Sequence, residues 1–233
     1  MDLAFTPEEQ AFREEVRTWV QANLPKEISH KVHNALRLTR DDMQGWAKIL
    51  GKKGWLAFGW PKEFGGPGWT AVQKHLFEEE CALAGAPRII PFGPVMVAPV
   101  IMAFGNAEQQ KRFLPGIASG EVWWSQGYSE PGSGSDAAAL KTRAVRDGED
   151  YLLDGSKVFI SGAGSTDVLV VMARTGGEGA KGVSAFMVPA QTPGVSYGKA
   201  EEKMGWNSQP TREVNFNAVR IPARFRLGEE GEG

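Results

Sequence analysis

The sequence predicts an α+β protein: an all-α N-terminal domain over residues 1–120, then a small β-barrel or sandwich domain over residues 121–233. Three observations predict this fold class. Up to about residue 120, apolar residues recur at helical spacing behind polar capping residues. Beyond it, short runs rich in β-branched residues alternate with Gly, Pro, Asp and Asn. Neither part contains an internal repeat or a low-complexity tract.

The first helix is predicted in TPEEQAFREEVRTWVQANL, residues 6–24. Thr6 is a suitable N-cap, Pro7 suits the first helical position, and Glu9 stands three residues after Thr6, as a capping box requires. Apolar residues recur at helical spacing along this segment and form one stripe: Phe5, Phe12, Val16, Trp19 and Val20. The pattern predicts an amphipathic helix.

Further helices are predicted in four segments. TRDDMQGWAKILGKKG begins at Thr39 and stops at Gly54, and TAVQKHLFEEECALAG begins at Thr70 and ends at Gly85. PVMVAPVIMAFG is apolar nearly all round, so we expect a buried helix. NAEQQKRFLPGIASG is a short helix with Asn106 as its cap.

The second half contains strand and turn signals. The predicted strands lie in YLLDGSKVFISG, DVLVVMART, GVSAFMVPA, GVSYGKA and EVNFNAVRIP, and EVWWSQ before them is also strand-like. The final LGEEGEG is expected to be a flexible acidic tail that closes no element.

Composition excludes several classes of function. The formal net charge of −2 gives no electrostatic case for nucleic acid or an anionic membrane as partner. No apolar run approaches the ~20 residues of a membrane span, and the acidic N-terminus lacks the apolar core of a signal peptide. Cys81 is the single cysteine, so no internal disulfide forms, and a cytoplasmic location is expected.

The usual catalytic constellations are missing. His30, His33 and His75 are expected on helices or their edges, and no third metal ligand accompanies the first two. Cys81 has no base to pair with and is interpreted as a buried helix residue. The carboxylates of FEEECA are interpreted as a solvated helix face. No phosphate-binding P-loop is present, and GSGSD does not open a helix as a dinucleotide fingerprint does. We expect no metal.

The stretch GYSEPGSGSD, residues 127–136, joins two strand-like runs. Exposed glycine amides and serine hydroxyls suit anionic or carbonyl oxygens, so a ligand loop is one interpretation, and a tight polar turn is the other. In an extended loop, Ser129, Ser133 and Ser135 project on one side. Phe159, followed by a hydroxyl at Ser161, suits stacking on a planar ring, although strand core is the better physical interpretation.

These segments together resemble the acyl-CoA dehydrogenase family. The resemblance rests on SEPGSGSD, then DGSKVFISGAGSTD, then TPGVSYGKAEEKMGWNSQPTREVNFNAVRIP, in that order, with FGWPKEFGG in the first half. It covers essentially the whole chain. The second half is most similar to short-chain and branched-chain members such as isobutyryl-CoA dehydrogenases, and the first half to bacterial members of broad substrate range.

The resemblance implies α,β-dehydrogenation of an acyl-CoA thioester to the 2-enoyl-CoA. FAD accepts a hydride, a glutamate takes the α-proton, and an electron-transfer flavoprotein receives the electrons. Family members carry the base on a third, helical domain that is absent here. We therefore assign no catalytic residue, and expect this chain to be a fragment that is inactive alone, from a protein that is homo-oligomeric when complete.

Site residues follow from the resemblance position by position. Gln126, Gly127, Tyr128 and Ser129 match the segment that lines the flavin. Gly134 and Ser135 match the pair where flavin and CoA meet, and Ser135 is expected to contact the substrate.

The second motif supplies the remaining cofactor residues. Phe159 matches the aromatic residue beside the flavin ring, Ile160 follows it, and Ser161 matches the hydroxyl that reaches flavin N5. Two alternatives stay open: a non-catalytic subunit of a heteromeric acyl-CoA dehydrogenase, and a related flavin oxidase or monooxygenase.

Overall fold

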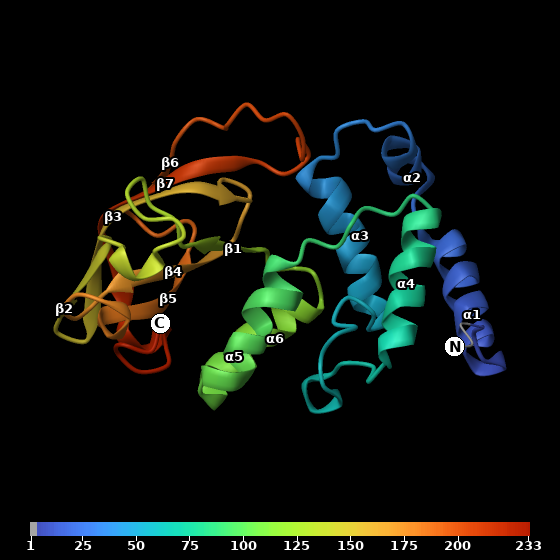
Figure 1. The fold of residues 1–233 in the computed structure, drawn as a ribbon, viewed down its shortest axis with the longest axis horizontal. Coiled ribbons are helices and arrows are strands. Elements are labelled where there is room, and N and C mark those ends of the chain that lie inside the picture. The colour runs from blue at the N-terminus through green and yellow to red at the C-terminus, as the bar shows by residue number, and fades with distance from the viewer. Residues whose placement is uncertain (1–3) are drawn as a thin grey trace. The chain divides into compact units, whose positions relative to one another are not determined.

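The computed structural model describes residues 4–233, which form two compact units. One unit holds the chain up to Pro94 together with Gly116–Glu121, and the other holds Val95–Pro115 and Val122–Gly233. Helices precede a mixed sheet along the chain (Figure 1), so the predicted fold class is confirmed.

Helices make up most of the first unit. They are α1 (Pro7–Asn23), α2 (Lys26–His33), α3 (Arg40–Lys53), the 3-10 turn η1 (Lys62–Phe64) and α4 (Ala71–Leu83). Thr6, Thr39 and Thr70 each form a reciprocal capping box, which confirms the three predicted helix starts. The sequence did not reveal α2, because its N-cap, Pro25, makes no side-chain hydrogen bond.

Aromatic side chains dominate the core of this unit. Trp46, Leu50 and Phe77 are almost fully buried. The rings of Trp55 and Trp69 meet edge to face with centroids 5.4 Å apart. Edge-to-face packing brings the positive ring edge onto a negative face, which adds to the gain from burying apolar area.

Glu80 corrects one expectation from the sequence. FEEECA was interpreted as a solvated face, but Glu80 is only 2% exposed. Its oxygens accept hydrogen bonds from Nε of Arg13 at 2.7 Å and from Nε of Arg17 at 2.9 Å, which ties α4 to α1. The hydrogen bond from Arg17 lowers the pKa of Glu80, and the one from Arg13 adds to this, against the opposing effect of burial.

The apolar segment before α6 also differs from expectation. It forms a π-helical stretch, Phe92–Val97, followed by α5 (Ala98–Phe104). Only one side is buried, through Val97, Ala98 and Ile101. The opposite side is exposed, so the prediction of a fully buried helix is wrong; the exposed residues are Val95, Met96, Val100 and Phe104. The predicted cap of α6 (Ala107–Ala118) is confirmed, because Asn106 and Gln109 exchange hydrogen bonds.

Eight strands form one sheet in the second unit, in the order β6-β7-β3-β2-β4-β5-β8, with β1 paired to β4. The strands are β1 (Trp124–Gly127), β2 (Arg143–Asp147), β3 (Asp150–Ser161), β4 (Val168–Arg174), β5 (Val183–Pro189), β6 (Val195–Tyr197), β7 (Thr211–Pro222) and β8 (Arg226–Leu227). Short 3-10 turns, η3 (Ala137–Ala139), η4 (Ala180–Gly182) and η5 (Ala223–Phe225), join them.

The pairing of these strands is mixed. Most neighbours are antiparallel, whereas β4 runs parallel to β1 and to β2. The long strand β3 lies between β2 and β7, and its residues 150–153 pair with both. The predicted strand segments are confirmed, and β2 and β8 are added to them.

The last residues do not form the free tail that was expected. The Gly233 amide donates to the Val183 carbonyl at 2.9 Å, and the Gly231 amide donates to Ser184 Oγ at 2.9 Å. Glu230 accepts a hydrogen bond from the Tyr151 hydroxyl. The segment therefore packs on β5. Within residues 4–233, no helix has the length and apolar character needed to cross a membrane.

Replacing the buried carboxylate in Glu80→Gln is expected to lower the free energy of unfolding by about 2 kcal/mol at pH 7, because Arg13 and Arg17 both lose their buried partner and keep only the more exposed Glu79 and Glu14. The folded pKa of Glu80 is lowered. Its contribution is therefore complete above its unfolded pKa and disappears as the pH falls through the folded value. Urea unfolding followed by tryptophan fluorescence should show the two proteins converge in acid.

Glu14→Gln is the matched control, because Glu14 also pairs with Arg17 but its side chain is 64% exposed. We expect a change below about 0.5 kcal/mol. Equal losses in the two variants would contradict a special role for Glu80.

Candidate functional site

The first sequence motif folds into a tight turn after β1. The Glu130 and Ser133 backbones exchange two hydrogen bonds, of 2.8 and 3.1 Å. The Ser133 hydroxyl donates a hydrogen bond to the Asp136 carbonyl. Ser133 is buried, whereas Gly134 and Ser135 are exposed and Ser129 is half-buried. The three serines therefore do not project on one side, because the turn replaces the extended loop that this required.

The second motif lies at the end of β3, where the strand is irregular. Lys157 pairs with Val214 and Ile160 with Arg212, so two residues of β3 stand opposite one of β7. Phe159 takes a left-handed backbone with φ of 56°, and its side chain is 69% exposed. The interpretation of Phe159 as strand core is wrong, because this bulge turns the ring outward. Ile160 is buried and Ser161 half-buried.

The structure brings these two motifs together. The Val158 amide, beside Phe159, donates to the Ser129 carbonyl at 2.9 Å, and Lys157 Nζ donates to the Tyr128 carbonyl at 3.1 Å. Buried Gly127 and half-buried Gln126 lead into this contact along β1. Burial raises the pKa of the Tyr128 phenol despite a hydrogen bond with Gln126, which keeps the phenol protonated. Gly134 and Ser135 lie farther along the turn.

A buried ion pair, which sequence reasoning missed, supports this contact. Lys157 is 0% exposed and its Nζ lies 2.8 Å from Oε1 of Glu130. Burial acts to raise the pKa of Glu130, but hydrogen bonds from Lys157, Thr142 and Lys141 together outweigh it and lower that pKa. One signal for the pair was available: Lys157 has the same strand parity as the buried Tyr151.

The third motif forms a closed loop beside the second. Lys203 Nζ donates to the carbonyls of Trp206 at 3.1 Å and Gln209 at 2.6 Å, and to the Thr211 hydroxyl at 2.9 Å. The loop presents Met204 and Trp206 to solvent. It is joined to the end of β3, because the Gly162 amide donates to the Pro210 carbonyl at 2.7 Å. All three motifs thus converge around one stretch of β3.

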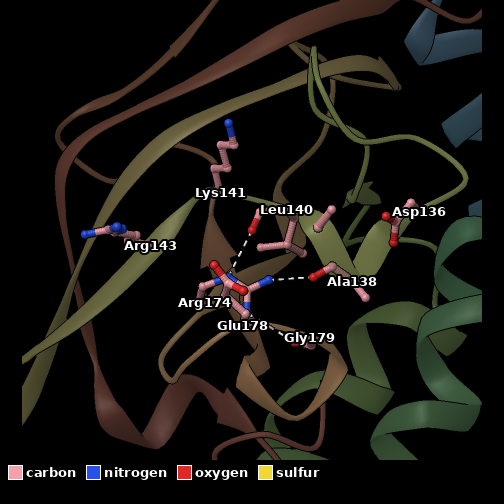
Figure 2. Close-up of a pocket in the computed structure, with 9 residues that line it drawn as sticks. Asp136, Ala138, Leu140, Lys141, Arg143, Arg174, Glu178 and Gly179 are labelled. Atoms are coloured by element: carbon pink, nitrogen blue, oxygen red, sulfur yellow. Dashed lines mark hydrogen bonds between the residues drawn. The ribbon is translucent and has the colours of Figure 1, made fainter.

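A pocket of about 650 Å³ opens next to Ser135, between the segment Asp136–Arg143 and residues near Arg174. Figure 2 shows the Arg174 guanidinium directed at the carbonyls of Leu140 and Ala138, to which it donates at 3.0 and 2.6 Å. These bonds make Arg174 a brace of the pocket wall. Exposed Lys141 and Arg143 contribute positive charge to the lining, and exposed Asp136 and Glu178 contribute negative charge.

Two other kinds of site, a metal centre and a reactive cysteine, have little support among the residues that the structure describes. Within residues 4–233, no cluster of three or more His, Cys, Asp or Glu could hold a metal ion. Burial raises the pKa of the Cys81 thiol to about 12, so this group is not a thiolate at neutral pH.

Comparison with known proteins agrees with this geometry. The family model described as "Acyl-CoA dehydrogenase, N-terminal domain" matches residues 6–121, and the one described as "Acyl-CoA dehydrogenase, middle domain" matches residues 125–219. The chain belongs to the acyl-CoA dehydrogenase family. Its turn and bulge are thus parts of an acyl-CoA dehydrogenase middle domain.

Acyl-CoA dehydrogenases similar to this chain come from distant organisms. FadE26 of Mycobacterium tuberculosis is 38% identical over 248 residues, covering 100% of this chain and 59% of FadE26. The mitochondrial isobutyryl-CoA dehydrogenase of Dictyostelium discoideum is 51% identical over 139 residues, covering 59% of this chain and 33% of that protein. The chain thus spans between a third and three-fifths of the length of these relatives.

The fold of this acyl-CoA dehydrogenase chain is also found among solved structures. The ChsE4-ChsE5 complex from Mycobacterium tuberculosis matches with a TM-score of 0.87 and 36% identity, covering 100% of this chain and 59% of that chain.

Replacing the outward-facing ring in Phe159→Gly should leave the free energy of unfolding within about 1 kcal/mol of wild type, since relief of strain offsets the added entropy of glycine. FAD, the cofactor that the family resemblance implies, should be held more weakly, because a stacking surface is lost. Chemical denaturation and a flavin titration of the complete gene product measure the two effects.

Ala218→Gly is the matched control, because Ala218 is also left-handed, with φ of 47°, and lies in β7 well away from Arg212 and Thr211, which pair with the end of β3. Ala218→Gly should change the free energy of unfolding as little as Phe159→Gly does, and it should leave flavin binding intact. If Phe159→Gly instead lowered the free energy of unfolding by about 3 kcal/mol, the Phe159 ring would be part of the core.

Proposed function

We propose that this chain is the flavin- and substrate-contacting part of an FAD-dependent acyl-CoA dehydrogenase, which converts an acyl-CoA thioester into the 2-enoyl-CoA. The observation that carries the proposal is the contact between the two motifs, in which the Ser129 carbonyl accepts the Val158 amide beside the outward-facing Phe159. A polar loop and an exposed aromatic ring are thereby held together on one face.

The residues at this face suit FAD. The exposed Phe159 ring offers a flat apolar surface to a planar heterocycle. Half-buried hydroxyls at Ser129 and Ser161 can bond to its polar edge, and the exposed backbone at Gly134 and Ser135 suits phosphate oxygens. When bound, FAD supplies the acceptor for the hydride that leaves the substrate β-carbon.

This chain's own part in the reaction is binding and orientation. Removal of the α-proton needs a base, and Glu130 does not suit that task. Its carboxylate is 8% exposed and accepts hydrogen bonds from Lys157, Lys141 and Thr142. The base is proposed to lie outside these residues, so the loops hold the thioester in reach of the flavin while another segment takes the proton.

The pocket beside Ser135 is the proposed place for the charged end of the substrate. Its exposed cations, Lys141 and Arg143, suit the phosphates of CoA, which would have to lie on their side of the pocket, away from the carboxylates of Asp136 and Glu178. Ser135 would then stand between that end and the flavin. The electrons are proposed to pass to an electron-transfer flavoprotein, as the family resemblance implies.

A second candidate is one subunit of a heteromeric acyl-CoA dehydrogenase. It is favoured by one observation: a solved structure that matches the whole chain is a complex of two named proteins, ChsE4 and ChsE5. In such a pair, the partner subunit supplies the base. The complete gene product would then bind FAD yet turn over substrate only when purified with its partner.

Anaerobic addition of acyl-CoA to the flavin-loaded complete gene product is expected to bleach the flavin's visible absorption. Thioesters with short, branched, long and steroid side chains should be compared. If no thioester reduces bound flavin, with or without a partner subunit, the proposal is wrong. Rapid re-oxidation by air would favour the oxidase alternative.

Ser161→Ala is expected to slow flavin reduction by roughly tenfold, which corresponds to one lost hydrogen bond. The melting temperature should hardly change, because the serine is half-buried and loses one hydroxyl. Ser165→Ala, in the turn that follows, is the control and should leave both quantities unchanged. Equal loss of stability and flavin reactivity would make Ser161 a structural residue instead.

A further inference from the structure

The ammonium group of Lys157 reaches under the first motif from the strand that carries the second. It donates to the Tyr128 carbonyl at 3.1 Å and to Glu130 Oε1 at 2.8 Å. Its aliphatic stem lies beside Gly127 and leaves room there for no more than a Cβ, which would stand 3.6 Å from Lys157 Cγ. One buried side chain thus bonds to two parts of the loop.

Glu130 extends this contact to two further segments. Its carboxylate accepts the backbone amides of Lys141 at 2.6 Å and Thr142 at 2.9 Å, at the start of the segment leading to β2. Its own backbone bonds to Ser133 in the turn. The Lys157–Glu130 ion pair therefore links β3, the turn and the segment before β2.

The link also fixes a register between two chain segments. The side chain of Lys157 bonds to the carbonyl of Tyr128, and the amide of Val158 bonds to the carbonyl of Ser129 at 2.9 Å. The bulge in β3 lies directly after these contacts and turns Phe159 outward. A shift of one residue between the segments would break both bonds at once.

We propose that the Lys157–Glu130 ion pair positions the flavin-contacting groups, by setting where Ser129 stands relative to Phe159. The inference rests on the proposed function. Lys157 is closed to solvent, so it touches no ligand and acts through its neighbours. A buried ion pair contributes little net stability compared with apolar side chains of similar size, because desolvation offsets the attraction. Its directional bonds, however, specify one register.

Glu130→Gln and Lys157→Met in the complete gene product test this, with Glu80→Gln as the matched control. Glu80 is an equally buried, arginine-paired carboxylate in the other unit. All three variants should melt at lower temperature. Only the Glu130 and Lys157 variants should bind FAD roughly tenfold or more weakly and shift its absorption bands and reduction potential, because displaced groups meet the ring.

Flavin affinity, spectrum and potential that stay at wild-type values in folded Glu130→Gln would overturn the inference, leaving the pair a purely structural one. Lys157→Arg covers the case in which the other variants do not fold. It keeps the charge but changes the donor geometry, and it should fold and still shift the flavin spectrum. An unshifted spectrum there also overturns the inference.

The wild-type protein separates this inference from the proposed function. If wild type binds no FAD, the proposed function fails and the positioning role fails with it. Suppose instead that wild type binds FAD and that acyl-CoA reduces the bound flavin. If every Lys157 and Glu130 variant then matches wild type in flavin affinity and spectrum, only the positioning role fails.

Discussion

The buried carboxylate of Glu130 is the interaction on which the candidate site depends. Two segments that are distant from it in the sequence supply its donors: Lys157 from β3, and the amides of Lys141 and Thr142 before β2. A carboxylate in a low-dielectric interior must be neutralised and hydrogen-bonded, or it costs several kcal/mol. Because this requirement must be met, the turn can pack against the sheet in only one way. The positions of the exposed loop residues follow from that packing.

The first unit solves a similar problem in the same way. Glu80 receives two arginines from α1, and the surrounding core is built of large aromatic rings. Bulky rings leave few alternative packings, and a buried charge pair allows only one helix register. Most of the stabilisation thus comes from burying apolar surface, which is not specific to one arrangement. A few directional hydrogen bonds and ion pairs then fix the register where two elements meet.

Helix starts and strand segments could be predicted from the sequence because their signals are local. Thr6, Thr39 and Thr70 act on residues three positions away. The ion-pair partners of Glu80 and Lys157 could not be predicted, since they lie 63 and 27 residues distant. The exposure of Phe159 likewise depends on how β3 pairs with β7. Family resemblance named the candidate site residues, and only tertiary contacts bring the motifs side by side.

The burial of Lys157 has a chemical consequence of its own. An acyl-CoA thioester, the proposed substrate, acylates amines that are accessible and unprotonated. The Lys157 amine is 0% exposed and its Nζ lies 2.8 Å from Glu130, so a thioester cannot reach it. Burial lowers the pKa of Lys157 against the opposing effect of Glu130, so its protection comes from burial and not from charge. A lysine directly behind the proposed thioester face is thereby shielded from the reagent that the protein handles. Exposed lysines such as Lys141 have no such protection.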